Sequence, residues 1–216
     1  MSTHPKAMPG CSSSDATVKI GAVVLAAGRS TRMGQPKMVL PWGRTTVIGN
    51  VISTLDAAGV EPVIVVIGSS AEMVREALLG TRSEIVFNPD YETDNMLISL
   101  RWGLSQMPGD VHAALVVLGD QPQIQEQVVQ QILAEYRDTP KKIIIPSFQM
   151  RRGHPWLIDR SLWSELSSLP EQVTLQAWLK LQSDNIHHTD VENDSILRDL
   201  DTPEDYLQEH PEVNRS

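Results

Sequence analysis

The sequence predicts an α/β protein with three layers, in which helices cover both faces of a mostly parallel central sheet. From Ile20 onward, short β-branched runs alternate with amphipathic helical stretches, a pattern typical of βαβ units. The run Ala113–Leu118 is apolar at every position, as expected of a central strand covered on both faces. Apolar residues make up 41% of the 216-residue chain and aromatic residues only 5%. Aliphatic side chains are therefore expected to fill the interior.

The predicted strands are short apolar or β-branched runs separated by helical patterns and turn residues. The first strand, Ile20–Ala26, leads directly into a glycine-containing loop. The region 151–157 is expected to form a loop and a strand, and 185–190 an edge strand. The other strands are predicted at Val63–Ile67, Glu84–Phe87, Ala113–Leu118 and 143–146.

The predicted helices show apolar residues at helical spacing, together with start and stop signals. The first helix follows from Val47, Ile48, Val51, Ile52 and Leu55, and Gly59 supplies its stop. The closing helix begins at Thr202, a natural N-cap, followed by Pro203 at the first helical position. Further helices are expected at 71–79, 96–106, 125–136, 161–168 and 173–181.

The domain organisation predicted from composition is a short tail followed by one domain. Residues 1–18 are rich in Ser, Thr, Pro and Gly and contain no apolar run that could form a signal-peptide core. A disordered tail is expected there, and its lone Cys11 is assigned no role. No internal repeat or linker follows, so residues 19–210 are expected to form a single domain.

Charge and composition exclude several classes of partner. The net charge of −9 and pI near 5.1 argue against the broad basic surface that nucleic-acid binding requires. No segment approaches eighteen consecutive apolar residues, so no membrane span is predicted. A single cysteine cannot form an internal disulfide. These features indicate a soluble, cytoplasmic protein that binds neither nucleic acid nor membrane.

The loop after the first strand has the composition of a phosphate-binding site. Gly28 and Gly34 allow backbone N–H groups to approach phosphate oxygens, while Arg29, Arg32 and Lys37 supply positive charge. The spacing fits neither the P-loop nor the dinucleotide-binding pattern G-x-G-x-x-G. The alternative explanation is a glycine-rich surface loop whose arginines are merely solvated.

Residues 25–37 resemble the pattern L-A-A-G-x-S-x-R-M-G-x-x-K, the signature of nucleotidyltransferases with the glycosyltransferase-A-like, nucleotide-diphospho-sugar transferase fold. Within that superfamily the chain is similar to the molybdenum cofactor nucleotidyltransferases, and in particular to their cytidylyltransferase branch. The resemblance implies catalytic roles for Arg32 and Lys37. It implies nucleotide binding by Leu25, Ala26, Ala27, Gly28, Arg29, Arg32, Gly34 and Lys37.

Asp120 is the predicted metal ligand, because it follows the apolar strand and matches the family's L-G-D-Q-P. A carboxylate facing a triphosphate would be repelled unless a cation bridged them, and Mg²⁺ binds one or two carboxylates plus phosphate oxygens. The resemblance also gives Asp120 a catalytic role. The alternative is an Asx-turn before Pro122. A second carboxylate is expected from Asp199 or Asp201, since this segment resembles the family's D-I-D-T-P-E-D, and Asp201 is favoured.

Two further segments are assigned through the resemblance. The stretch from Asn88 to Arg101 resembles the family's N-P-x-x…G-M-x-x-S-L-R, which approaches the base and ribose, so Asn88 and Ser99 are predicted nucleotide contacts. Ser99 could equally be a helix hydroxyl that serves packing or capping. Asn95 replaces the usual glycine, and a left-handed conformation is expected there.

The sequence Arg-Gly-His-Pro at 152–155 matches a family loop that faces the acceptor. Arg152, Gly153 and His154 are therefore predicted to bind the acceptor, through its phosphate or a pterin edge. His187 and His188 point to opposite faces of a strand and are expected to be solvated. Residues 169–175 depart from the G-D-x-G-A-R-like segment of many relatives, which weakens the assignment of the acceptor.

These parts imply a Mg²⁺-dependent nucleotidyltransferase that transfers CMP, or else GMP, from a nucleoside triphosphate to a phosphorylated small molecule. Molybdopterin is the suspected acceptor, and a molybdoenzyme client is a further candidate partner. A phosphate nucleophile needs no general base because its second pKa is about 6. Two alternatives remain: a sugar-phosphate or other alcohol-phosphate nucleotidyltransferase, and a non-catalytic molybdenum cofactor chaperone.

Overall fold

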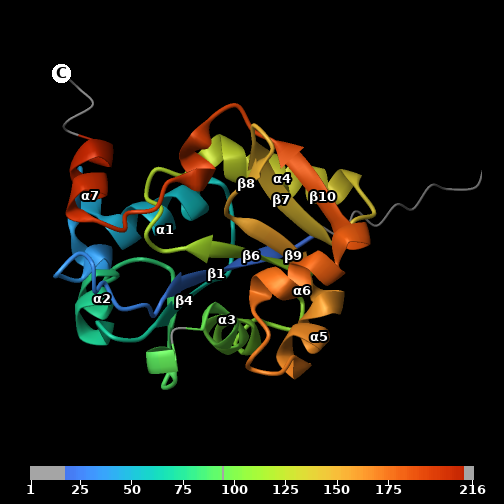
Figure 1. The fold of residues 1–216 in the computed structure, drawn as a ribbon, viewed down its shortest axis with the longest axis horizontal. Coiled ribbons are helices and arrows are strands. Elements are labelled where there is room, and N and C mark those ends of the chain that lie inside the picture. The colour runs from blue at the N-terminus through green and yellow to red at the C-terminus, as the bar shows by residue number, and fades with distance from the viewer. Residues whose placement is uncertain (1–17, 94, 212–216) are drawn as a thin grey trace, which may run out of the picture.

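An eight-stranded sheet in the order β10-β7-β9-β6-β1-β4-β5, with β8 paired to β7, divides the structure into two helical layers (Figure 1). The computed structural model describes residues 18–93 and 95–211. The predicted three-layer α/β class is confirmed. The strands of this sheet are β1 (Ile20–Ala26), β4 (Val63–Ile67), β5 (Glu84–Phe87), β6 (Ala113–Leu118), β7 (Ile143–Phe148), β8 (Arg151–Arg152), β9 (Trp156–Asp159) and β10 (Ile186–Asp190).

The sheet is mostly parallel, with one antiparallel strand inside it. Strand β1 pairs in parallel with both β4 and β6, and Leu25 on β1 lies beside Leu118 on β6. Strand β9 enters antiparallel between β6 and β7, and β10 is a parallel edge strand. Because β1 and β6 are neighbouring parallel strands that end at the same level, the loops that follow them lie side by side.

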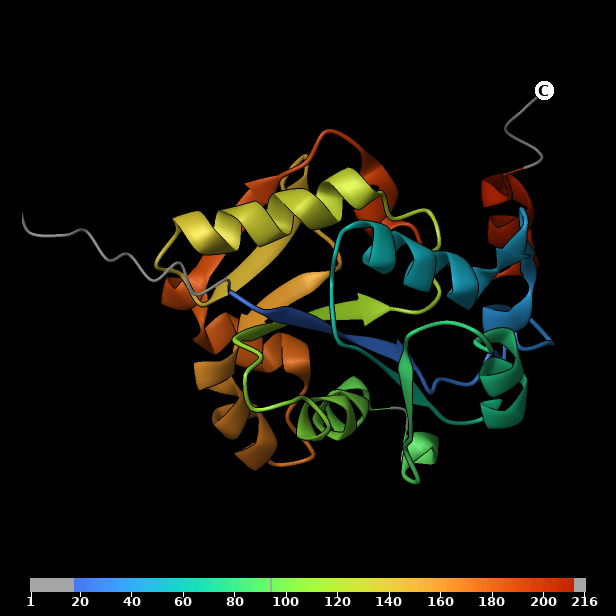
Figure 2. The ribbon, with the colours of Figure 1, turned by 180° about the vertical axis from the view of Figure 1, so that it is seen from behind.

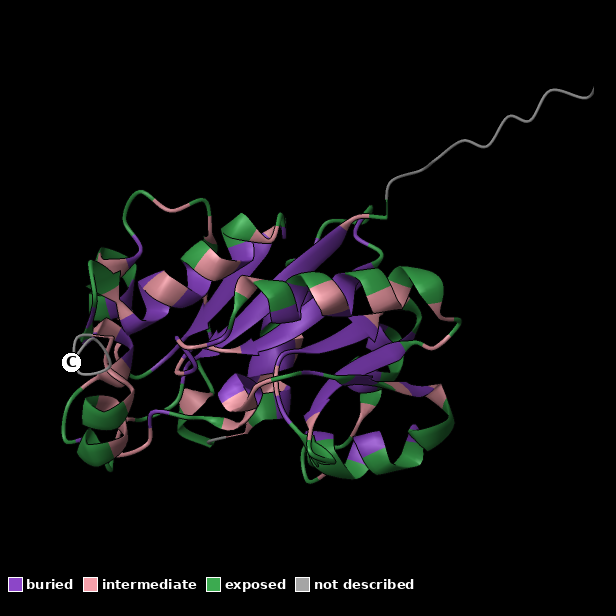
Figure 3. Cartoon of the chain, turned by 90° about the horizontal axis from the view of Figure 1, so that it is seen from above, coloured by how far each residue is buried: buried purple, intermediate pink, exposed green. Residues whose placement is uncertain are grey.

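Helices cover both faces of the sheet (Figure 2). One layer contains α1 (Val47–Ala57), α2 (Ala71–Ala77) and α4 (Glu126–Asp138), and the other contains α3 (Met96–Ser105), α5 (Trp163–Ser168) and α6 (Leu175–Leu181). Figure 3 shows that the strands are largely buried, whereas the helices around them carry many exposed residues. No helix in the described ranges has the length and apolar character needed to cross a membrane.

Short elements complete the fold at its edges. A hairpin of β2 (Pro41–Trp42) and β3 (Thr45–Thr46) precedes α1, and α7 (Pro203–Glu209) closes the described chain. Thr202 and Asp205 form a capping box at the start of α7, as the Thr-Pro signal predicts. The 3₁₀ helices are η1 (Lys37–Val39), η2 (Tyr91–Thr93), η3 (Arg160–Leu162), η4 (Ser183–Asn185) and η5 (Asp194–Leu197).

The predicted tail lies outside the described residues apart from Val18, and so does Cys11. The boundaries of the predicted domain, 19–210, stay a prediction.

A small third cluster of apolar side chains lies apart from the two main cores. Met33 from the glycine loop packs with Trp42 from the hairpin, Val47 from α1 and Leu200 from the segment before α7, and Tyr206 covers them. Leu200 is fully buried. This cluster fixes the glycine loop and the Asp199–Asp201 segment relative to each other.

Replacing Gly103 by alanine should destabilise the protein, because α3 lies against β1 at this point. An added Cβ would lie 2.3 Å from Val23 Cγ1 and 3.1 Å from Val66 Cγ2. Overpacking of this kind typically costs about 1 to 3 kcal/mol, and urea-induced unfolding would measure it. Gly109→Ala is the matched control, since no atom lies within 4 Å of its added Cβ. Equal stability of both variants would show that α3 can move away from β1 to accommodate the added methyl group.

Candidate active site

A cleft of about 340 Å³ lies where β1 and β6 end. The glycine loop forms one wall, and the segment before α7 together with Asp120 forms the other. The predicted site residues that line it are Leu25, Ala27, Gly28, Arg29, Arg32, Lys37, Ser99, Asp120 and Asp201. Those that do not line it are Ala26, Gly34, Asn88, Arg152, Gly153 and His154.

Two glycines shape the loop in different ways. Gly34 has a φ of +66°, a left-handed conformation that glycine adopts without steric cost. Gly28 would have no protein atom within 4 Å of an added Cβ. The space beside Gly28 is therefore open toward the cleft, as a site for close approach of a ligand requires.

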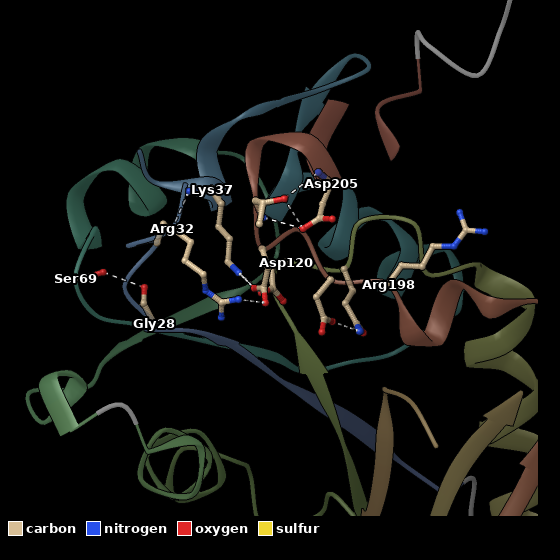
Figure 4. A network of polar contacts seen from close by, with 12 residues as sticks. Gly28, Arg32, Lys37, Ser69, Asp120, Arg198 and Asp205 are labelled. Atoms are coloured by element: carbon tan, nitrogen blue, oxygen red, sulfur yellow. Dashed lines mark hydrogen bonds and ion pairs between the residues drawn. The ribbon is translucent and has the colours of Figure 1, made fainter. Parts of the chain in front are cut away.

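Hydrogen bonds hold the loop at both ends. The Ser69 hydroxyl donates to the Gly28 carbonyl oxygen over 3.0 Å, and the Lys37 N–H donates to Ser30 Oγ over 3.0 Å (Figure 4). These contacts fix the backbone on either side of the arginines. The charged ends of Arg32 and Lys37 are consequently aimed across the cleft.

The strongest feature of the cleft is a cluster of two cations and two carboxylates (Figure 4). Lys37 Nζ lies 2.5 Å from Asp120 Oδ2 and 3.0 Å from Asp201 Oδ1. Arg32 Nη1 lies 3.0 Å from the other oxygen, Asp201 Oδ2. Residues far apart in the sequence thus meet at one point.

Burial and neighbouring carboxylates oppose each other in setting the pKa of Lys37 but act together on the pKa of Asp199. Burial alone would lower the pKa of Lys37, but the charges and hydrogen bonds of Asp120 and Asp201 outweigh it and leave the pKa raised. Burial also raises the pKa of Asp199, and the charges of Asp120 and Asp201 add to this effect against the hydrogen bond from Gln121. The crowding of three carboxylates makes a nearby positive charge favourable.

The chemistry of these carboxylates fits magnesium. Within the described ranges, no group of three or more His, Cys, Asp or Glu side chains is placed to hold a metal ion. Magnesium does not need such a group, because it is commonly bound by one or two carboxylates plus substrate phosphates. Asp120 and Asp201 could therefore supply the protein ligands, with the phosphates of a nucleotide completing the coordination.

The carboxylate segment is anchored to the end of β6. The Leu200 N–H donates to the Asp120 carbonyl oxygen over 3.2 Å. Gln121 Nε2 donates to Asp199 Oδ1 over 2.6 Å. Asp199 also lines the cleft. Its carboxylate accepts a hydrogen bond from Gln121, whereas that of Asp201 pairs with Lys37 and Arg32.

The side of the cleft predicted to hold the base is formed by the start of α3. Ser99 lines the cleft, and the buried Asn88 lies behind it and donates from Nδ2 to Ser99 Oγ over 3.0 Å. The left-handed conformation expected for Asn95 is wrong. Its φ is −106°, and its side chain caps α3 by accepting from the Leu97 N–H, a role that Asn performs from extended backbone.

Sequence reasoning missed several lining residues on this side. Tyr91, Met96 and Leu118 line the cleft. Arg29 lies 2.7 Å from Glu92 and over the Tyr91 ring, so a loop predicted to bind phosphate also contacts η2. The aromatic residue in Asn-Pro-Asp-Tyr was the available signal for this contact.

The predicted acceptor loop lies beside the cleft, next to the end of β6. Its backbone is fixed: the Gly153 N–H donates to the Pro146 carbonyl oxygen, and the His154 N–H donates to that of Ile196 over 3.1 Å. Arg152 is exposed on β8. The preceding tip, Gln149–Met150, has positive φ at both residues, and Met150 is 95% exposed.

His154 is held as a neutral ring. It stacks on Trp156 with centroids 4.2 Å apart. Burial lowers the pKa of His154 to about 4, so it carries no positive charge at neutral pH. Its Nε2 atom is buried and has no hydrogen-bond partner among the described residues.

The adjacent histidines on β10 differ from each other. The expectation that His187 is solvated is wrong, because its Nε2 lies 2.6 Å from Glu135 of α4 and the ring is half-buried. His188 is exposed, as predicted. Partial burial and the nearby charge of Arg152 lower the pKa of His188, which places Arg152 close to it.

Residues 22–189 match the family model described as the MobA-like NTP transferase domain. The chain belongs to this family. It is a nucleotidyltransferase of the MobA-like type, which confirms the predicted family, fold and enzyme class. Nucleotidyltransferases of this kind generally use a divalent metal ion.

Two curated relatives cover most of the chain. The molybdenum cofactor cytidylyltransferase of Escherichia coli (strain K12) is 26% identical over 189 residues, which are 87% of this chain and 94% of the relative. The nicotine blue oxidoreductase of Paenarthrobacter nicotinovorans is 28% identical over 199 residues, 86% and 93% of the two chains. Relatives of similar identity thus carry different names, so the details of the reaction must be argued from the residues of the MobA-like site itself.

A solved structure supports the same fold. Rv0371c from Mycobacterium tuberculosis H37Rv has a TM-score of 0.76 at 28% identity, and the match covers 88% of this chain and 97% of that one. A second structure of Rv0371c, in complex with manganese, has a TM-score of 0.71 at 29% identity and covers 89% and 98%.

The low pKa of His154 predicts a stability that falls with acidification. Between pH 6.5 and about 4, the unfolded chain binds a proton at this imidazole and the native state does not. The free energy of unfolding should therefore fall by about 1 to 2 kcal/mol between pH 7 and pH 5 through this group. His154→Gln should lack that component in urea titrations at the two pH values. The same decrease in both proteins would mean that solvent reaches the ring.

Proposed function

We propose that the protein is a Mg²⁺-dependent nucleotidyltransferase that moves CMP from CTP to a phosphorylated acceptor, with molybdopterin as the leading acceptor and pyrophosphate as the other product. The observation that carries this proposal is the meeting of Lys37 and Arg32 with Asp120 and Asp201 in one cleft. A triphosphate needs the cations, and a magnesium ion bridging to it needs the carboxylates. The site thus contains what the reaction requires.

The reaction needs alignment and charge neutralisation more than proton transfer. An oxygen of the acceptor phosphate forms a bond to the α-phosphorus, and the bond to the bridging oxygen of pyrophosphate breaks. The nucleophile is already largely ionised, since its second pKa is about 6. Lys37, Arg32 and the backbone N–H groups beside Gly28 neutralise the phosphate oxygens and hold them in line. Asp120 and Asp201 would hold the magnesium ion, which would supply further positive charge.

The choice of nucleotide rests on a relative rather than on the base side of the cleft. The relative named as a cytidylyltransferase supports CMP over GMP. Asn88 donates to Ser99 Oγ, which leaves the Ser99 hydroxyl proton to donate toward the cleft. That donor suits the ring or carbonyl acceptor of a base, which cytosine and guanine both have, so the preference for CMP rests on the relative alone.

The acceptor is proposed to lie between the cleft and β8. Exposed Arg152 suits a phosphate, because a guanidinium pairs with phosphate through two parallel hydrogen bonds. His154 is neutral and suits the hydrogen-bonding edge of a pterin more than a phosphate. The loop is fastened through Ile196 to the segment that contains Asp201, so acceptor and nucleotide would be held in a fixed relation.

Asp120→Asn should abolish turnover and preserve the fold. A neutral amide is a poor magnesium ligand of nearly the same size, and loss of a preorganised charge contact costs roughly 10² to 10³ in kcat. The assay measures pyrophosphate from each of the four ribonucleoside triphosphates with metal-loaded molybdopterin. Asp110→Asn is the matched control, because Asp110 is exposed and pairs with Lys19 before β6 begins. Normal turnover by Asp120→Asn would reduce Asp120 to a turn residue. Turnover with sugar phosphates instead of molybdopterin would support the alcohol-phosphate alternative.

Arg152→Ala should weaken use of the acceptor without weakening nucleotide binding. The KM for the acceptor should rise by roughly tenfold or more, the scale expected for a lost charge-assisted hydrogen bond of about 1.5 to 3 kcal/mol. Calorimetric titration with CTP should match that of the wild type. Arg151→Ala is the neighbouring control, since Arg151 is also exposed on β8 but points to the opposite face of the strand. A loss of CTP affinity in Arg152→Ala would place the loop at the nucleotide.

A further inference from the structure

The positively charged side chains of the cleft form ion pairs with its carboxylates. Lys37 bridges Asp120 and Asp201, and Arg32 takes the second oxygen of Asp201. Both oxygens of Asp201 and one oxygen of Asp120 are therefore engaged by positive charge. These are the same carboxylates that the proposed function assigns to magnesium, and the same cations that it assigns to phosphate.

We propose that Lys37 and Arg32 block the metal site of the nucleotide-free protein, and that a triphosphate opens it by drawing both cations onto its own oxygens. This inference rests on the proposed function. It makes the divalent cation and the nucleotide a coupled pair: neither is bound well until the other is present. Lys37 and Arg32 exchange the carboxylates for phosphate oxygens, and Asp120 and Asp201 exchange the two side chains for the metal ion. The charges of all four side chains are therefore paired both before and after nucleotide binding.

The structure indicates which side chains would move. Asp120 follows Gly119 just after the end of β6, and Asp201 lies between the fully buried Leu200 and the capping residue Thr202. The carboxylates are therefore fixed by backbone contacts. Lys37 and Arg32 reach them only through long side chains, and the Arg32 side chain is 70% exposed. The cations can swing toward a ligand beside Gly28 without any change in the backbone.

Charge balance explains why the triphosphate favours binding of the metal ion. A divalent cation entering the nucleotide-free site would have to displace the ammonium group of Lys37, which lies between two carboxylates on a side chain that is only 13% exposed. A triphosphate offers Lys37 replacement oxygens, and this removes the competition. By linkage, whatever factor the nucleotide adds to metal affinity the metal adds to nucleotide affinity.

The test is Mn²⁺ binding without any nucleotide, measured from the electron paramagnetic resonance signal of the free ion. Lys37→Met keeps the unbranched stem of the side chain and removes its charge, so it should bind Mn²⁺ roughly tenfold more tightly than the wild type, within the usual range of coupling energies. Arg32→Met, at an exposed position, should bind it a few-fold more tightly. The matched control is Lys142→Met, at an exposed lysine outside the cleft, and it should bind as the wild type does.

The outcomes separate this inference from the proposed function. Asp120→Asn should remove Mn²⁺ binding in the Lys37→Met background, and if it does not, the metal site itself is wrong. If Asp120→Asn removes binding but neither Lys37→Met nor Arg32→Met tightens it, the metal site stands and the exchange is overturned. Folding of each variant is checked by thermal melting. Mn²⁺ should raise the melting temperature of Lys37→Met more than that of the wild type.

Discussion

The two walls of the cleft are joined through the burial of one side chain, Leu200. Asp199 and Asp201 flank it in the sequence, and its insertion among Met33, Trp42 and Val47 holds both carboxylates opposite the glycine loop. Its N–H group simultaneously bonds the Asp120 carbonyl oxygen. A hydrophobic contact thus holds the carboxylates of this segment close to the positively charged side chains of the loop. Without this contact, the Asp199–Asp201 segment would lose its apolar packing against the glycine loop.

The sheet supplies the other half of this constraint. Parallel pairing of β1 with β6 brings the glycine loop and Asp120 out at adjacent positions, although about ninety residues separate them in the sequence. The opposed charges offset each other in a protein with a net charge of −9. Local pairing therefore keeps basic side chains together in an acidic molecule, and these are the groups that the proposed function assigns to an anionic substrate.

Much of this arrangement could be predicted from the sequence because it depends on local patterns. The apolar run of β6, the strand before the glycine loop and the Thr-Pro start of α7 each encode their own structure. The insertion of β9 between β6 and β7 could not be predicted. Its four residues, Trp156–Asp159, carry no signal that distinguishes a central antiparallel strand from an edge, since strand order is decided by tertiary packing.

The candidate site was predictable to a similar degree, for a related reason. Charged residues such as Lys37 and Asp120 stand out in a motif, but the direct ion pair between them does not. The burial that keeps His154 neutral arises from stacking on Trp156 and cannot be recognised from a histidine before a proline. The role of Asn95 as a helix cap likewise depends on where α3 begins.

The exposed tip at Gln149–Met150 has a consequence for how such proteins diversify. It joins β7 to the two-residue β8, and its side chains are solvated, with Met150 almost fully so. Insertions at this tip would lengthen one hairpin arm while leaving the glycine loop, Leu200 and the carboxylates in place. Under the proposed function, in which Arg152 of β8 binds the acceptor, new acceptors could thus be recruited by remodelling a single turn while the nucleotide site is kept. The same turn is accordingly the natural position at which to build a library of altered acceptor specificity.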